Sequence, residues 1–252
     1  VARLDSPYIV KIFDIGIQPS GDKEMHFIVM EYVSGHTLTS RIEDKGLPGR
    51  DELLSRLRVY WQLLQAVYYA HQHSVVHRDL KPDNVMISNE GRVKIMDFGL
   101  AVLDDSHSQT RDDQIMGTMA YFAPEQAKGG KSVDHRADIY ALGVILFELC
   151  CGDLPFMGQN ALHMLQLVMN EPCPRVSLRN PQVPRPLEDL ILQSMLKEPK
   201  DRPANVGVMI DKLEDILKNS FKVATSRLDD LAAPQFEEPV AAPVHPKGNF
   251  VV

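Results

Sequence analysis

The stretch HRDLKPDNVM, residues 77–86, decides the fold of this 252-residue chain. It carries an aspartate, Asp79, a lysine, Lys81, and an asparagine, Asn84, within one short segment. Two further motifs follow in order, DFG at residues 97–99 and APE at residues 123–125. Any one of the three could arise by chance, but chance does not account for all three in this order.

With these motifs the chain resembles the eukaryotic-type protein kinases, from residue 1 to about residue 220. The segment DHRADIYALGVILFELCCGDLPF, residues 134–156, is most similar to the bacterial branch of that family. The resemblance implies an α+β, protein-kinase-like fold with a mainly helical large lobe and a remnant of the small β lobe. It also implies a Ser/Thr protein kinase, because Lys81 is typical of that class.

The residue types suit the transfer of the γ-phosphate of ATP to a protein hydroxyl, which depends on positioning and on cations. Asp79 can orient a substrate hydroxyl and accept its proton. Asn84 and Asp97 offer hard oxygen ligands of the kind that Mg²⁺ prefers. Lys81 is a point charge suited to the transferring phosphate. By resemblance, Thr118 is the threonine that forms a hydrogen bond near the catalytic aspartate.

Further positions take their roles from the resemblance alone. Met30 would lie at the gate of the adenine pocket, Glu31 and Val33 would make backbone contacts to the adenine, and Met86 would form the pocket floor. The expected small molecules are therefore ATP and Mg²⁺.

The resemblance also implies a set of structural residues. His77 would pack beneath Phe98, Asp138 would brace the backbone of the loop that holds Asp79, and Arg202 would pair with Glu125. We expect the charges of Asp138 and Arg202 to be buried, so that losing one partner would destabilise the fold by several kcal/mol.

The segment between Asp97 and Thr118 contains candidate sites of regulatory phosphorylation. A phosphate there could pair with the guanidinium fork of Arg78. A carboxylate in the same segment could already supply part of this anionic partner, or it could be a solvated loop charge. The candidates are Ser106, Ser108 and Thr110, of which Thr110 is preferred, and the carboxylate is Asp112.

The composition is typical of a soluble globular protein and argues against several other classes. Apolar residues make up 44% and charged residues 24% of the chain, as in soluble globular proteins. The net charge of -7 and the lack of a basic run argue against binding to nucleic acid. The apolar run at residues 138–152 is too short and too charged to span a membrane, and predicts a buried core helix. Three cysteines without CxxC spacing favour a reducing, cytoplasmic compartment.

Hydrophobic spacing predicts a few strands followed by a mainly helical body. The predicted strands are 8–17 with 25–33, and 84–88 with 92–96, each pair forming a hairpin. The predicted helices are 51–71 and, approximately, 138–151, 161–169, 187–197 and 204–218.

Three parts are expected along the chain. Residues 1–33 would be the remnant of the small lobe, comprising the end of helix C, strands 4 and 5 and the hinge. Residues 34–220 would be the large lobe. Residues 221–252, rich in Ala and Pro, would be a disordered tail.

The chain contains neither a GxGxxG loop nor a VAIK-like strand with its lysine, which a complete kinase needs. Because the pattern begins at Val1 near the expected end of helix C, we expect a further N-terminal part. On its own, the chain would then bind nucleotide weakly and transfer little phosphate, and the hairpin within residues 8–33 would be marginally stable.

Other interpretations deserve comparison. A pseudokinase-like scaffold would be expected to lose Asp79, Asn84 or Asp97, and a small-molecule phosphotransferase would lack Lys81 and the peptide-docking segment around Thr118. All of these are present.

Two weaker motifs also have alternative explanations. His71, His73 and His77 could form a metal cluster, although a core role for His77 is favoured. Residues 16–23 resemble a phosphate-binding loop, but the displaced lysine and the absence of a following helix pattern favour a hairpin turn.

Overall fold

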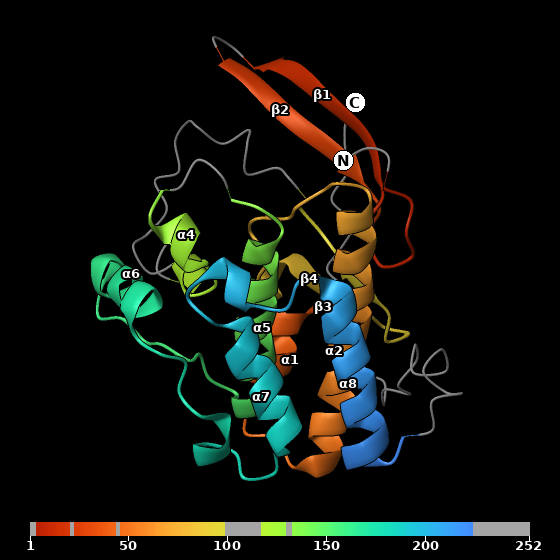
Figure 1. The fold of residues 1–252 in the computed structure, drawn as a ribbon. Helices are drawn as coiled ribbons and strands as arrows, with labels where there is room; N and C mark the ends of the chain where they lie inside the picture. The colour runs from red at the N-terminus through yellow and green to blue at the C-terminus, as the bar shows by residue number, and fades with distance from the viewer. Residues whose placement is uncertain (1–3, 21–22, 44–45, 99–116, 130–132, 224–252) are drawn as a thin grey trace.

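A β-hairpin projects from one end of a helical body (Figure 1). The computed structural model describes residues 4–20, 23–43, 46–98, 117–129 and 133–223. β1 (Ile12–Ser20) pairs antiparallel with β2 (Lys23–Met30), and the register shifts between Ile12 and Asp14. The predicted hairpin is confirmed, although both strands are displaced along the chain, and residues 16–20 belong to β1 while Lys23 begins β2.

A second, three-stranded sheet has the order β3-β4-β5. It consists of β3 (Gly35–Thr37), β4 (Val85–Ser88) and β5 (Val93–Ile95), all antiparallel. The β4–β5 hairpin was predicted, whereas β3 is too short to show a period of two. Gly35 is required in β3, because a Cβ atom there would lie 2.0 Å from the carbonyl oxygen of Ile87.

The chain before the first hairpin is fastened to this second sheet by its backbone. Ile9 forms a parallel bridge with Ile95. The Val10 amide donates to the Ile95 carbonyl at 2.9 Å, and the Ile95 amide donates to the Tyr8 carbonyl at 2.9 Å. These bonds connect the hairpin to β5, two residues before Asp97.

Helices form most of the remaining structure. The long predicted helices are confirmed within a few residues, whereas α1 and α4 were not predicted, because helices this short show no clear period. The helices are α1 (Leu38–Glu43), α2 (Arg50–Gln72), α4 (Pro124–Ala127), α5 (Arg136–Cys151), α6 (Ala161–Asn170), α7 (Arg185–Ser194) and α8 (Val206–Phe221). The predicted tail from residue 221 lies outside the described residues from residue 224 onward.

Local sequence signals explain where several helices begin and end. Asn160 caps α6 by accepting a hydrogen bond from the His163 amide, and Asn205 caps α8 in the same way from the Val208 amide. α5 ends at Gly152, whose φ of 73° lies in the left-handed region that favours glycine.

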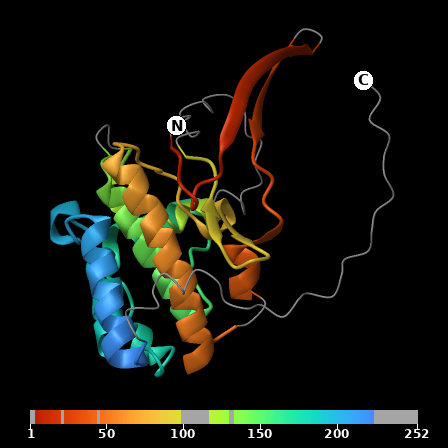
Figure 2. The same ribbon diagram turned by 90° about the vertical axis from the view of Figure 1, so that its right-hand side faces the viewer.

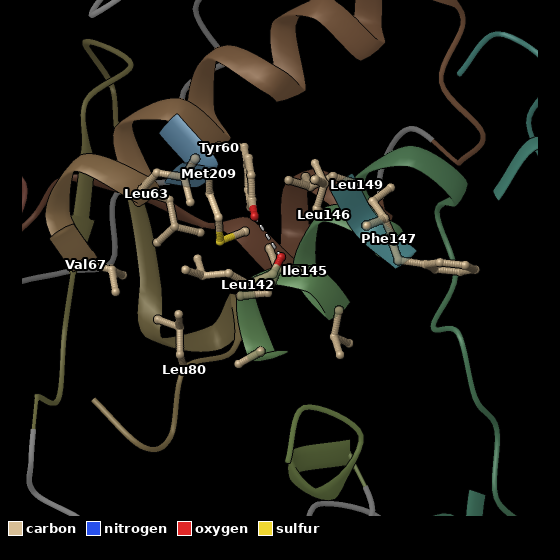
Figure 3. Packing of buried hydrophobic residues seen from close by; sticks show 14 of the residues in the cluster. Tyr60, Leu63, Val67, Leu80, Leu142, Ile145, Leu146, Phe147, Leu149 and Met209 are labelled. Carbon is tan, nitrogen blue, oxygen red and sulfur yellow. Dashed lines mark hydrogen bonds between the residues drawn. The ribbon is translucent and has the colours of Figure 1, made fainter. Parts of the chain in front are cut away.

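The core lies where α2, α5 and α8 meet (Figure 3). Side chains from three helices and from the loop after α2 meet there, including Leu63, Leu142, Met209 and Leu80. The Tyr60 hydroxyl donates to the Leu142 carbonyl at 3.0 Å, which joins α2 to α5. α5 is buried on nearly every face, as predicted. Within the described ranges, no helix combines the length and apolarity needed to cross a bilayer.

The β1–β2 hairpin, in contrast, stands away from the core (Figure 2). Apolar side chains on both of its strands are exposed, among them Phe13 (62%), Ile15 (52%) and Ile17 (57%). Since these side chains bury little surface, the hairpin gains little stability from packing, which agrees with the expectation that it is marginal.

Candidate active site

Residues 77–84, the part of the α2–β4 connection that directly precedes β4, are called the HRD loop below. Its backbone is held by the carboxylate of Asp138, at the start of α5. The His77 amide donates to Asp138 Oδ2 at 2.9 Å, and the Arg78 amide donates to Oδ1 at 2.9 Å. Arg78 has a φ of 67°, a left-handed conformation that is unfavourable for a residue with a side chain. The predicted contact between Asp138 and this loop is present.

His71, which the sequence suggested as a possible metal ligand, contacts Asp138 instead. His71 Nε2 lies 2.8 Å from Asp138 Oδ2, at a carboxylate whose residue is only 1% exposed. Burial alone would raise the pKa of Asp138, but the hydrogen bond from His71, together with the positive potential of His77 and His71, lowers this pKa below its ordinary value. Asp138 therefore stays ionised while it holds the loop.

The three histidines considered as a metal cluster have three different partners. His71 bonds to Asp138, His73 Nδ1 lies 2.8 Å from the Tyr69 carbonyl, and His77 Nε2 lies 2.9 Å from the Met96 carbonyl. The contacts of each ring favour structural roles.

Four of the predicted catalytic residues meet at the HRD loop. Asn84 Nδ2 donates to the Asp79 carbonyl at 2.8 Å and to Asp79 Oδ2 at 3.2 Å. Lys81 Nζ lies 3.4 Å from Asp79 Oδ2 and donates to Thr118 Oγ1 at 2.9 Å. The lysine therefore links the loop to the segment that contains Thr118.

Asp97 reaches the same region because β5 ends beside the HRD loop. The Met96 amide donates to the Asn84 carbonyl at 2.9 Å, which places Asp97 one residue beyond a direct backbone contact with Asn84. Asp97 is exposed, whereas Phe98 is buried with its ring 4.6 Å from the His77 ring. The predicted packing of His77 with Phe98 is present.

The oxygen atoms of Asn84 and Asp97 fit a magnesium ion by their chemistry. The Asn84 amide nitrogen is used as a donor to Asp79, which leaves the amide oxygen to act as a ligand. The exposed carboxylate of Asp97 supplies a second hard oxygen donor. Mg²⁺ is commonly held by one or two such protein ligands together with waters and phosphate oxygens.

Residues 117–127, called the docking segment below, are joined to the body by an ion pair between the half-buried Glu125 and the buried Arg202. Arg202 Nη1 and Nη2 donate to Glu125 Oε1 and Oε2, each at 2.8 Å. The same guanidinium also donates to the carbonyls of Leu196, Arg136 and Lys197. The predicted pairing of Glu125 with Arg202 is therefore present, in bidentate geometry.

Residues predicted to contact adenine lie at the end of β2, in the segment after it, and in β4. The Glu31 amide donates to the Lys11 carbonyl at 2.8 Å, and Lys94 Nζ donates to Glu31 Oε2 at 2.8 Å. Met30 is 37% exposed, and Val33 and Met86 are half-buried. Their grouping around a single pocket stays a prediction.

The Glu31–Lys94 ion pair was not predicted. Burial tends to raise the pKa of Glu31, but the hydrogen bond and charge of Lys94 and the backbone bond from Lys11 lower it. A lysine on a short strand gives no sequence signal for such a pair.

The regulatory candidates Ser106, Ser108, Thr110 and Asp112 lie outside the described residues, as does Gly99 of the DFG motif. Arg78, their predicted partner, is exposed on the HRD loop. Its carbonyl accepts a hydrogen bond from Gln126 Nε2 at 2.7 Å, a contact that the sequence analysis missed.

A half-buried glutamate on α5, Glu148, also contacts the docking segment. The Tyr121 hydroxyl donates to Glu148 Oε2 at 2.7 Å. Burial raises the pKa of Glu148 to about 7, and the negative charges of Asp83, Glu43 and Asp153 act in the same direction against the hydrogen bond from Tyr121. Glu148 is therefore more easily protonated in the folded state than its ordinary value of 4.5 indicates.

We expect Glu148→Gln to stabilise the fold at pH 8, by up to about 3 kcal/mol. Since the pKa of Glu148 is higher in the folded state than in the unfolded state, stability is lost as the pH rises from about 4.5 to about 7, and the loss is complete above pH 7. The difference between variant and wild type should therefore shrink as the pH falls through 7 toward 4.5. Urea unfolding at several pH values measures it. Glu198→Gln, at an exposed side chain, is the control, and a difference for Glu148→Gln that does not vary with pH would contradict the raised pKa.

The sequence is similar to those of known proteins. The sequence matches the protein kinase domain family over residues 1–221. It is 38% identical over 201 residues to the serine/threonine-protein kinase PrkC of Bacillus subtilis, covering 80% of this chain and 30% of that protein. It is 35% identical over 252 residues to the serine/threonine-protein kinase PknB of Mycolicibacterium smegmatis, covering 96% of this chain and 39% of that protein. The chain thus spans about a third of the length of these relatives.

Proposed function

The chain belongs to the protein kinase family, and we propose that it carries the part of a serine/threonine kinase that moves the γ-phosphate of ATP onto Ser or Thr hydroxyls of proteins. Family membership establishes the α+β kinase fold, and the similar proteins are named serine/threonine kinases. The observation that carries the proposal is the cluster in which Asn84 and Lys81 contact Asp79 while Lys81 also contacts Thr118.

Asp79 is the proposed base. Asn84 and Lys81 both contact its oxygen Oδ2, so the orientation of the carboxyl group is set by two neighbours. The carboxylate can then orient a substrate hydroxyl toward the phosphorus atom and accept its proton as the new bond forms.

Lys81 has a second proposed role besides orienting Asp79. Because its ammonium group lies between Asp79 and Thr118, it places a positive charge where the base meets the docking segment. That charge can stabilise the transferring phosphoryl group.

ATP and Mg²⁺ are the proposed small-molecule partners. Asn84 and Asp97 would hold the metal ion, which supplies positive charge that neutralises the phosphates. Met30, Glu31, Val33 and Met86 would contact the adenine, and this part of the proposal rests on the resemblance.

Regulation through the segment that follows Asp97 also remains a proposal. The exposed side chain of Arg78 could pair with a phosphate on Thr110, Ser106 or Ser108, or with the carboxylate of Asp112.

The cysteines and the net charge bear on the proposed cellular location and on the proposed class of substrate. Cys150, Cys151 and Cys173 are free thiols, which supports a reducing, cytoplasmic location. The net charge of -7 supports protein rather than nucleic-acid substrates.

We expect the full-length protein that contains this chain to phosphorylate itself on serine and threonine rather than tyrosine. The contact between Lys81 and Thr118 brings the docking segment close to Asp79, where a short side-chain hydroxyl must reach the base. Mass spectrometry of the protein after incubation with ATP and Mg²⁺ identifies the acceptors, with Asp79→Asn as the control for contaminating activity. A product dominated by phosphotyrosine would overturn the proposed specificity.

A further inference from the structure

We infer that Gln126 is a positioning residue for Asp79, because it holds the peptide group that joins Arg78 to Asp79. This inference rests on the proposed function, since it assigns to Gln126 the task of fixing the proposed base. It adds a direct connection between the docking segment and the base that is separate from the Lys81–Thr118 contact.

Both polar atoms of that peptide group have partners. The Arg78 carbonyl oxygen accepts from Gln126 Nε2 at 2.7 Å. The Asp79 amide donates to His77 Nδ1 at 3.3 Å. Because the peptide group is planar, holding its oxygen and its nitrogen fixes the plane, and with it the direction in which the Asp79 side chain leaves the backbone.

The backbone on the other side of Arg78 explains why this peptide group needs to be held. Arg78 has a φ of 67°, a left-handed conformation that is unfavourable for a residue other than glycine. Its amide is fixed by Asp138 at 2.9 Å, so relaxation of the strain would have to occur through its carbonyl. Gln126 bonds to that carbonyl and thereby opposes the relaxation.

The direction of the Gln126 amide follows from its two partners. Its oxygen Oε1 accepts from the Ala123 amide at 3.0 Å, and its nitrogen Nε2 donates to the Arg78 carbonyl. An N–H group can only donate and a carbonyl can only accept, so only this orientation of the side-chain amide satisfies both.

Gln126 is itself fixed to the body of the protein. It lies in α4, directly after Glu125, whose carboxylate is bound on both oxygens by Arg202. The HRD loop is therefore held by α5 through Asp138 and by α4 through Gln126. A displacement of the docking segment would release the Arg78 carbonyl and, with it, the orientation of Asp79.

Three variants of the full-length kinase test the inference. Gln126→Glu keeps an acceptor for the Ala123 amide but has no donor for the Arg78 carbonyl, and Gln126→Met removes both bonds. Gln182→Glu makes the same change of charge at an exposed side chain and is the matched control. We expect kcat to fall about tenfold in both Gln126 variants, because each loses the hydrogen bond to the Arg78 carbonyl, with KM for ATP unchanged and the control like wild type.

Hydrogen exchange supplies a readout that does not depend on activity. In Gln126→Glu, amides of a peptide spanning residues 77–81 should exchange faster, while those of α5 and the melting temperature stay as in wild type. Faster exchange throughout α4 and α5 with a lower melting temperature would show a merely structural role and overturn the inference. So would unchanged kcat and unchanged exchange in residues 77–81.

The test of Asp79 as the base is distinguishable from the test of Gln126 as its positioning residue. Turnover that persists in Asp79→Asn would overturn the assignment of the base, whatever the Gln126 variants do. Turnover that requires Asp79 but is unaffected in Gln126→Glu would overturn only the positioning role.

Discussion

Replacing Asp79 by asparagine should lower kcat of the full-length protein by about 10²- to 10⁴-fold, the contribution of a positioned general base. Asparagine has nearly the same shape and can still accept from Asn84 or Lys81, so the HRD loop should keep its conformation. The side chain would, however, no longer carry the charge that orients the hydroxyl and takes its proton. Phosphate transfer to a Ser/Thr peptide measures the loss.

Two controls separate chemistry from binding and folding. Calorimetric titration with ATP and Mg²⁺ should give the same affinity for Asp79→Asn as for wild type. Asp189→Asn, which removes the same charge from an exposed position on α7, should keep wild-type turnover. Full activity in Asp79→Asn would refute the role of Asp79 as the base.

Breaking the Glu125–Arg202 pair should destabilise the fold by about 3–5 kcal/mol. Arg202 is 4% exposed, and Glu125 binds both of its terminal nitrogens, so Glu125→Gln leaves a buried guanidinium without a counter-charge. Urea unfolding of the chain measures the change. Lys94→Met, which breaks the ion pair with Glu31 at a more exposed site, should lower stability by no more than about 1 kcal/mol.

The double variant Glu125→Leu with Arg202→Met provides a further check. Since it leaves no unpaired charge in the interior, it should be more stable than either single replacement. A loss in the double variant equal to the sum of the losses in Glu125→Leu and Arg202→Met would show that the carboxylate and the guanidinium do not depend on each other.

The sequence predicted those features that depend on local pattern. The segments of α2 and α5 are long and rich in apolar residues, and both helices lie where this pattern predicts them. Asp79, Lys81 and Asn84 belong to one continuous motif, so their proximity follows from the chain itself. β3 and α4 are too short to show any period and were missed.

Other features depend on contacts between distant segments or on backbone conformation. The resemblance supplied the pairing of Glu125 with Arg202, which no spacing in the chain indicates. The sequence gives no signal for the role of Gln126, because the partner of its side chain is a backbone carbonyl in a distant loop. The left-handed conformation of Arg78 is equally hidden, since arginine carries no preference for it.

The bridge between Ile9 and Ile95 attaches the chain before β1 to β5. The ion pair between Lys94 and Glu31 attaches the chain after β2 to the same strand. Both ends of the hairpin are therefore joined to β5, two residues before Asp97. A displacement of the hairpin would accordingly act first on the strand that leads to this carboxylate.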